Sequence, residues 1–210
     1  MPKESVFTAA LSRLARIPFA LQEERPFSPP EKALILKPCC VSQAMLTTPL
    51  LAALSQQYPA TRFDWAISDW ARPTVIGNPR LTELISTGAG GLDGLSWREL
   101  SALAKRFERE QYDTVFIPSR SSLLSLVAWM AHIPQRIGLR ADGRGFAHTH
   151  AVAPAPDVMQ ETAVYLSLAT AAAVSEEVMA AAKMEFYPSD SARMAVTERL
   201  IDDVDWLGER

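Results

Sequence analysis

The fold is decided by the stretch ALILKPCCVSQAMLTTPLLAAL, residues 33–54, because its hydrophobic period changes partway along it. Residues 33–36 form a short continuous apolar run, which is typical of a strand buried on both faces of a sheet. Apolar side chains then recur at i, i+4, i+7 and i+8, the spacing of a helix with one buried face: Leu46, Leu50, Ala53 and Leu54. The stretch therefore predicts a βα unit, with its strand at about residues 33–37 and Gln43 near the start of the helix.

The same alternation of strand and helix continues along the chain. Further strands are predicted at residues 63–67, 83–86, 114–117 and 136–139. Helices are predicted at residues 96–107, 123–130, 158–174 and 190–207. The first of these begins with Ser96 and Glu99 at the spacing of a capping box. Strands that alternate with helices indicate an α/β fold with a mainly parallel sheet covered on both faces.

The two ends of the chain differ from this central pattern. Residues 4–16 predict a short amphipathic helix, which either packs on its own domain or docks on a membrane surface through its basic residues. The proline-rich residues 25–30 predict an extended linker. We therefore expect an N-terminal helix and linker at residues 1–30, a domain at residues 31–188 and a C-terminal helical segment at residues 189–210.

The composition limits the classes of protein to which the chain can belong. The 210 residues are 48% hydrophobic and carry a net charge of −3, so they can bury a core and have no basic field for nucleic acid. No apolar run reaches the roughly 18 residues of a membrane helix, and no signal-peptide pattern is present, which predicts a cytoplasmic protein. Cys39 and Cys40 are adjacent, a spacing that predicts free thiols in a reducing compartment.

The candidate site is expected beyond the carboxyl ends of the strands, where parallel sheets bind ligands. The first of these loops carries Lys37 and leads into a helix with Ser42 and Thr47 in its first turns. Because helix N-terminal amides attract anions, this loop predicts an anionic or hydroxyl-rich ligand. The alternative is that Ser42 only caps the helix and Lys37 is solvated.

Three further segments carry candidate chemistry. The glycine cluster at residues 88–94 lacks the last glycine of a nucleotide fingerprint, so it predicts a flexible connection. Guanidinium groups bind carboxylates and phosphates, so Arg136, Arg140 and Arg144 form either an anion site or a solvated basic loop. His148 and His150 have no further ligand nearby to complete a zinc set. The sequence therefore predicts neither a metal site nor a cofactor.

Landmark motifs follow one another along the sequence. The first are at residues 33–38, 46–54 and 58–59. Later ones are Gly77-Asn78-Pro79-Arg80 with Glu83-Leu84-Ile85, Tyr112-Asp113-Thr114-Val115, Arg136-Ile137-Gly138-Leu139 and Glu161-Thr162-Ala163-Val164-Tyr165-Leu166. In this order and spacing, over about residues 32–175, the chain resembles the N-terminal half of glycosyltransferase family 9, the ADP-heptose:lipopolysaccharide heptosyltransferase family.

The resemblance implies a GT-B arrangement of two Rossmann-like domains, of which this sequence matches the first, on the acceptor side. It implies inverting transfer of a sugar from a nucleotide diphosphate sugar to a hydroxyl of a glycan or glycolipid. The family continues into a second domain that binds the donor, whereas this sequence stops at Arg210. The implied partners are therefore a nucleotide diphosphate sugar, held through that absent domain, and a glycan or glycolipid acceptor.

The sequence departs from the family at the position of the base. The family has an aspartate there, in the first loop, whereas this chain has Gln43, whose amide cannot accept a proton at neutral pH. Asp69, just after the second strand, is the nearest substitute. The residues expected to bind the acceptor are Lys37, Ser42, Thr47, Ser119, Arg120, Arg136, Arg140 and Arg144. The alternative is a non-catalytic carbohydrate- or anion-binding module on the same scaffold.

Overall fold

The computed structural model describes residues 26–90, 92, 95–140, 146–155 and 160–204. Within these residues, six parallel strands form one sheet in the order β3-β2-β1-β4-β5-β6. The strands are β1 Lys32–Leu36, β2 Arg62–Ile67, β3 Glu83–Ser86, β4 Thr114–Ile117, β5 Gln135–Leu139 and β6 His150–Val152. The sheet confirms the predicted α/β fold class.

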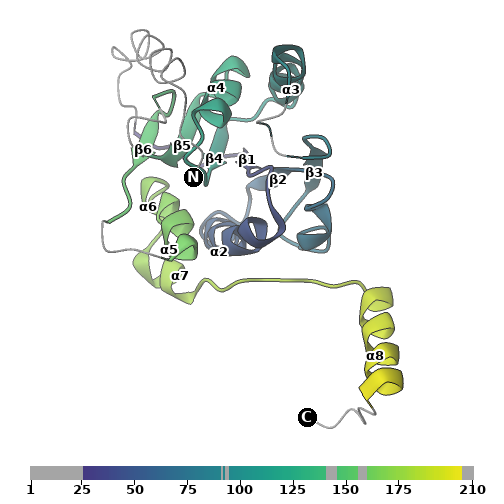
Figure 1. Cartoon of the computed structure of the whole chain (residues 1–210). Coiled ribbons are helices and arrows are strands. Elements are labelled where there is room, and N and C mark those ends of the chain that lie inside the picture. The colour runs from purple at the N-terminus through teal and green to yellow at the C-terminus, as the bar shows by residue number, and fades with distance from the viewer. Residues whose placement is uncertain (1–25, 91, 93–94, 141–145, 156–159, 205–210) are drawn as a thin grey trace.

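Helices cover both faces of the sheet and make a three-layer sandwich (Figure 1). The helical elements are α2 Val41–Gln57, η2 Arg72–Thr74, α3 Trp97–Arg109, α4 Ser122–Met130, α5 Glu161–Leu166, α6 Leu168–Ala171, α7 Glu176–Ala181 and α8 Asp190–Val204. Helix α2 packs against α5, α6 and α7 on one face, and α3 packs against α4 on the other. Because successive strand residues point to opposite faces, Ile35 enters the core under α2 and Leu34 the core under α3.

The order of the strands reverses between β1 and β4. The chain runs from β1 outward to β3, then returns to β4 and runs outward to β6 on the other side. The helices that follow β1 and β4 pack on opposite faces of the sheet, which is the arrangement at which ligands bind in open parallel sheets. The topology therefore places the candidate ligand site at this switch point.

The starts of the helices follow from local side-chain chemistry. Ser96 and Glu99 form the predicted capping box at α3: the Ser96 amide donates to the Glu99 carboxylate at 2.7 Å, and the Glu99 amide to the Ser96 hydroxyl at 3.4 Å. The N-cap of α2 is Cys40, without a side-chain capping bond, so the alternative that Ser42 caps this helix is wrong. Gln43 is the third residue of α2, as predicted.

The prediction of a single helix at residues 158–174 is wrong. The described part of this segment forms two short helices, α5 and α6, which meet at Ser167. The Ser167 hydroxyl donates to the Val164 carbonyl at 2.7 Å, and the Thr170 hydroxyl to the Ser167 carbonyl at 2.7 Å. Such side-chain bonds to the backbone compete with the regular helical ladder and bend or end it.

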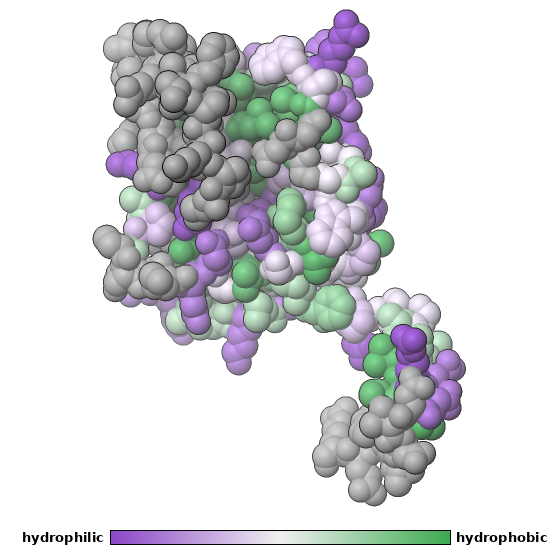
Figure 2. All heavy atoms as spheres, in the orientation of Figure 1, coloured by the Kyte–Doolittle hydropathy of each residue, from purple (hydrophilic) through white to green (hydrophobic). Residues whose placement is uncertain are grey.

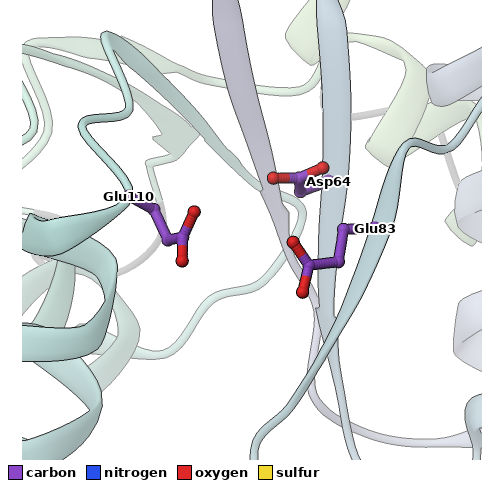
Figure 3. Close-up of side chains that lie close together, drawn as sticks. All are labelled: Asp64, Glu83 and Glu110. Atoms are coloured by element: carbon purple, nitrogen blue, oxygen red, sulfur yellow. The ribbon is translucent and has the colours of Figure 1, made fainter.

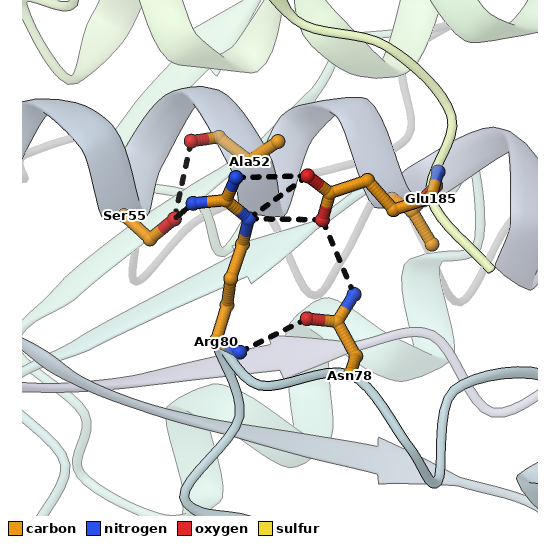
Figure 4. Close-up of polar contacts among 6 residues, drawn as sticks. Ala52, Ser55, Asn78, Arg80 and Glu185 are labelled. Carbon is orange, nitrogen blue, oxygen red and sulfur yellow. Dashed lines mark hydrogen bonds and ion pairs between the residues drawn. The ribbon is translucent and has the colours of Figure 1, made fainter. Parts of the chain in front are cut away.

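An extended segment after α7 leads to α8 and is anchored on the sandwich. The Arg80 guanidinium binds Glu185 at 2.8 Å and 2.9 Å, and also donates to the Ser55 hydroxyl at 2.9 Å (Figure 4). The Glu185 amide donates to Thr48 at 3.0 Å. Beyond this anchor, α8 stands away from the sandwich, and exposed apolar side chains lie along it: Met194, Val196, Leu200 and Ile201 (Figures 1 and 2).

The ends of the chain are described only in part. The helix predicted at residues 4–16 and the last residues of the C-terminal segment lie outside the described residues. Residues 26–30 have no regular structure, but Phe27 packs against Tyr58 with ring centroids 6.0 Å apart. No helix among the described residues is long and apolar enough to cross a membrane.

Candidate functional site

The loops at the carboxyl edge of the sheet are bonded to one another. After β2, the Ser68 amide donates to the Pro38 carbonyl at 2.8 Å, and the Asp69 amide to the Gly88 carbonyl at 2.9 Å. The Trp65 indole donates to the Lys37 carbonyl at 3.3 Å. These bonds fix the loops after β1, β2 and β3 relative to one another.

Lys37 is the charged residue at the switch point between β1 and β4. Its ammonium donates to the Pro118 carbonyl at 2.8 Å and to the Tyr165 hydroxyl at 3.1 Å, so it joins β1 to β4 and α5. The side chain is 4% exposed, and the alternative that Lys37 is solvated is therefore wrong. Burial lowers the pKa of Lys37 to about 8, with Glu161 raising it and Arg120 lowering it.

An ion pair extends this cluster toward solvent. Arg120, in the loop after β4, binds Glu161 of α5 at 3.0 Å, and each side chain is about two-fifths exposed. The Tyr165 hydroxyl and the Arg120 guanidinium lower the pKa of Glu161, so this carboxylate stays ionised and is a weak base. Burial raises the pKa of Tyr165. Lys37, Arg120, Glu161 and Tyr165 are called the switch-point cluster below.

Two helices begin beside the switch-point cluster. Helix α2 has no acidic residue in its first turn, and Val41, Ser42 and Gln43 are exposed there. Helix α4 begins after Arg120, also without an acidic residue in its first turn or a side-chain capping bond. Helix N-termini carry partial positive charge, so their amides and Arg120 together favour an anionic group at this edge.

The structure separates the predicted acceptor-binding residues by burial. Ser42, Ser119, Arg120 and Arg140 are partly or fully exposed at the carboxyl edge, as is Asp69. Thr47 is fully buried and donates to the Gln43 carbonyl at 2.8 Å. Arg136 is also buried, and it donates to the Ala147 and Ile133 carbonyls at 2.6 Å each. Thr47 and Arg136 therefore have structural roles. Arg144 lies outside the described residues.

Glu161 and Tyr165 belong to a landmark motif of the sequence, but their pattern did not mark them as site residues. Their spacing of four residues on one helix puts both side chains on the same face, which is the signal that could have paired them. What the pattern could not show is that this face meets Lys37 and Arg120. Those contacts span 128 and 41 residues of sequence.

The two adjacent cysteines at this edge are not free thiols. Cys39 and Cys40 form a disulfide, with their Cα atoms 3.2 Å apart across a cis peptide bond. The expectation of free thiols assumed that a ring between neighbouring residues does not close. Both residues are only partly buried, between Lys37 and the exposed first turn of α2.

Three carboxylates gather away from this edge, nearer the start of the strands: Asp64, Glu83 and Glu110 (Figure 3). Lys32 already supplies a positive charge there, with its ammonium 2.7 Å from Glu110 and 3.7 Å from Asp64. The Tyr112 hydroxyl donates to Asp64 at 2.8 Å. We interpret this cluster as an ion-pair network that links β1, β2 and the end of α3.

The chain is similar to known proteins in both sequence and fold. No protein-family model matches the chain. Lipopolysaccharide heptosyltransferase 2 from Salmonella typhimurium is 27% identical over 113 residues, which are 54% of this chain and 32% of the relative. The protein of the same name from Escherichia coli is 28% identical over 113 residues, which are again 54% of this chain and 32% of the relative. The match thus spans about a third of the length of these curated relatives.

Solved structures match over more of the chain. The glycosyl transferase family 9 structure from Veillonella parvula has a TM-score of 0.71 at 17% identity, and covers 89% of this chain and 52% of its own. The E. coli ADP-heptose lps heptosyltransferase II structure has a TM-score of 0.62 at 20% identity, with 85% and 52% covered. These matches confirm the predicted fold class, and with the sequence relatives they support the resemblance to glycosyltransferase family 9.

Proposed function

We propose that this chain is the acceptor-side domain of a family 9-like glycosyltransferase. The reaction is transfer of a heptose-like sugar from a nucleotide diphosphate sugar to a glycan or glycolipid. The observation that carries the proposal is the switch-point cluster, which puts charged and hydroxyl groups where such a fold binds ligands. The sequence match to lipopolysaccharide heptosyltransferases over 113 residues supports the sugar class.

The acceptor is an anionic glycan on this view. Arg120 and Arg140 are exposed at the edge, and the first turns of α2 and α4 are free of acidic residues. Lys37 is buried, so it does not contact the acceptor directly. It attracts the anionic acceptor through its charge and holds the Tyr165 hydroxyl in place. If the acceptor is a glycolipid, this function requires peripheral contact with the cytoplasmic surface of a membrane.

The donor is held by a second domain in this proposal, as the family resemblance implies. Gln43 then hydrogen-bonds an acceptor hydroxyl, because its amide donates and accepts but takes no proton. Asp69 is the candidate base, since it is an exposed carboxylate whose backbone is fixed at the same edge. A base contributes typically about 10²- to 10⁴-fold to the rate, so Asp69→Asn in the complete enzyme tests this role.

The test of acceptor binding is titration calorimetry with deacylated, phosphorylated lipopolysaccharide core oligosaccharide at low and high salt. We expect binding that weakens with salt. Arg120→Ala weakens it roughly five- to tenfold at low salt, because a half-exposed charge is partly screened. Arg98→Ala is the matched control, since Arg98 is an exposed arginine of α3. Equal affinity of Arg120→Ala and Arg98→Ala would show that the acceptor does not bind at the carboxyl edge of the sheet.

Gln43 favours a second candidate function, a non-catalytic carbohydrate- or anion-binding module on the same scaffold. This module predicts the same glycan binding without any need for a donor. The two functions separate when the chain is joined to a donor-binding domain of a relative and supplied with nucleotide sugar. Product above the buffer control supports the transferase, and binding without product supports the module.

A further inference from the structure

Trp70 is an indole left in water at the carboxyl edge of the sheet. It follows Asp69 in the loop after β2, and its side chain is 57% exposed, whereas the next residue, Ala71, is fully buried. Transfer of apolar surface out of water is favourable, so an exposed indole loses burial energy unless something covers it. The loop therefore presents an unused apolar surface beside the candidate site.

The backbone that carries Trp70 is fixed on both sides. Besides its bonds to Pro38 and Gly88, the loop closes on itself, because the amides of Ala71 and Arg72 donate to the Ser68 carbonyl at 3.1 Å and 3.0 Å. The Arg72 guanidinium also donates to the Leu84 carbonyl at 3.3 Å. A ligand that uses Trp70 thus does not have to order the loop first, which lowers the entropy cost of binding.

Polar residues lie near Trp70 in the sequence and in the loops that follow β2 and β3. Asp69 is its exposed neighbour, and its carboxylate is an acceptor for hydroxyl groups. Among the described residues, the hydroxyls of Ser68 and Thr87 are buried without a hydrogen-bond partner, each one residue past the end of its strand. Buried polar atoms in native proteins normally have partners, so hydrogen-bonding capacity is unused at this edge. An exposed indole next to an exposed carboxylate fits a ligand that has both an apolar and a polar surface.

A pyranose ring has such a surface, because its C–H bonds form an apolar face and its hydroxyls project from the rim. We propose that Trp70 is a stacking platform for one pyranose ring of the acceptor, with Asp69 accepting a hydrogen bond from a hydroxyl of that ring. This inference rests on the proposed function. The arginines there bind the anionic group of the acceptor, and Trp70 adds the contact to its sugar ring. If Asp69 also serves as the base, the stacked ring is the one that receives the new bond.

The platform and the charged part of the edge are separated by β1. Trp70 follows β2, and Arg120 follows β4, on the other side of β1. Two strand spacings make about 10 Å, which is roughly the span of two linked pyranose rings. One ring therefore stacks on Trp70 while an anionic group of its neighbour lies near Arg120.

The experiment compares Trp70→Ala, Trp70→Phe and Trp97→Ala. Trp97 is 61% exposed on α3, so it is a matched control for the loss of a surface indole. The probes are deacylated lipopolysaccharide core oligosaccharide with and without its phosphates, titrated at high salt. We expect Trp70→Ala to weaken binding of both probes roughly tenfold, a loss in the range of that seen when an aromatic platform under a nucleobase is removed. Trp70→Phe keeps most of the affinity, and Trp97→Ala changes nothing.

Two outcomes separate this inference from the proposed function. If wild-type protein and Trp70→Ala bind the core oligosaccharide equally well, Trp70 is not a stacking platform, and the proposed function still stands. Wild-type protein that binds neither probe at low salt overturns both. Proton NMR of the bound core is the second measurement: stacking moves the ring's C–H signals upfield through the indole ring current, in the wild type and in Trp97→Ala alike. Absence of that shift also overturns the platform, whether or not Trp70→Ala folds.

Discussion

His148 is a buried imidazole that packs on the backbone of β5 at Gly138. Within the part of the chain that the structure describes, neither of its ring nitrogens has a hydrogen-bond partner. Burial and, to a smaller extent, the charge of Arg136 together lower the pKa of His148 from its ordinary value of 6.5 to about 4. The folded protein thus holds this residue neutral, and protonation favours the unfolded chain.

This residue predicts a loss of stability in acid. Because the pKa is lower in the folded state, the unfolded state binds more protons between about pH 6.5 and 4, so the free energy of unfolding falls as the pH drops through that window. The slope is at most about 1.4 kcal/mol per pH unit. Urea denaturation at several pH values measures it, and His148→Gln reduces the slope. An unchanged slope in His148→Gln contradicts the assignment.

Gly138 makes room for that imidazole. A Cβ atom built at this position overlaps the His148 ring, so Gly138→Ala forces the ring or the strand to move. We expect Gly138→Ala to destabilise the fold by about 1–3 kcal/mol, the usual cost of overpacking. In the background of His148→Ala the same change costs much less. Thermal unfolding of the four proteins in this cycle checks the coupling, and simple additivity would show that the two residues do not compete for space.

Several residues singled out by sequence have structural roles, and burial is the property that the pattern could not show. Arg136 and Thr47 are chemically suited to ligands, yet their donors are used by backbone carbonyls. Lys37 and Arg120 were found because their strands could be placed, and strand ends converge at one edge. Trp70 was missed because an aromatic side chain near a strand usually signals core.

At the level of elements, an ion pair anchors the side chain of the extended segment before α8. Arg80 and Glu185 are 105 residues apart in sequence, and Asn78 adds a 3.5 Å bond to the same carboxylate (Figure 4). The carboxylate raises the pKa of Arg80, mainly through its hydrogen bond. The landmark Gly77-Asn78-Pro79-Arg80 is therefore a docking turn for the extended segment.

Removal of this anchor predicts a local release. Glu185→Ala removes the ion-pair partner of Arg80 and leaves its bond to Ser55, and we expect faster hydrogen exchange across residues 183–188 with a loss of about 1 kcal/mol in unfolding free energy. Glu177→Ala, an exposed carboxylate of α7, is the control. Exchange rates that match between the two variants would mean that the segment is held by other contacts.

Strands and helix starts were predictable because they depend on local pattern. Strands β3 and β4 have the predicted bounds, and the capping box placed α3. The break between α5 and α6 was not predictable from hydrophobic period, because it is made by the hydroxyls of Ser167 and Thr170. The docking of Glu185 was not predictable either, since its partner is distant in sequence.

At the level of the whole molecule, the chain spans about a third of its curated relatives and about half of the solved chains that it matches. A transferase must hold donor and acceptor together, because most of its rate comes from that proximity. We therefore expect this chain alone to give no product from nucleotide sugar and core oligosaccharide, and no submillimolar binding of the nucleotide sugar. Mass spectrometry of the reaction and calorimetry of the donor check both points. Turnover above the buffer control would show that one domain suffices.

The order of the strands also governs how this sheet behaves toward its own copies. The border strands β3 and β6 have only four and three residues, whereas β1 and β2, with five and six, lie inside. An edge strand is a template on which another chain can add a strand, and each unpaired peptide group offers a further hydrogen bond. Short borders give a neighbouring copy little to extend, so the longer strands are kept out of fibrillar self-assembly by their place in the sheet.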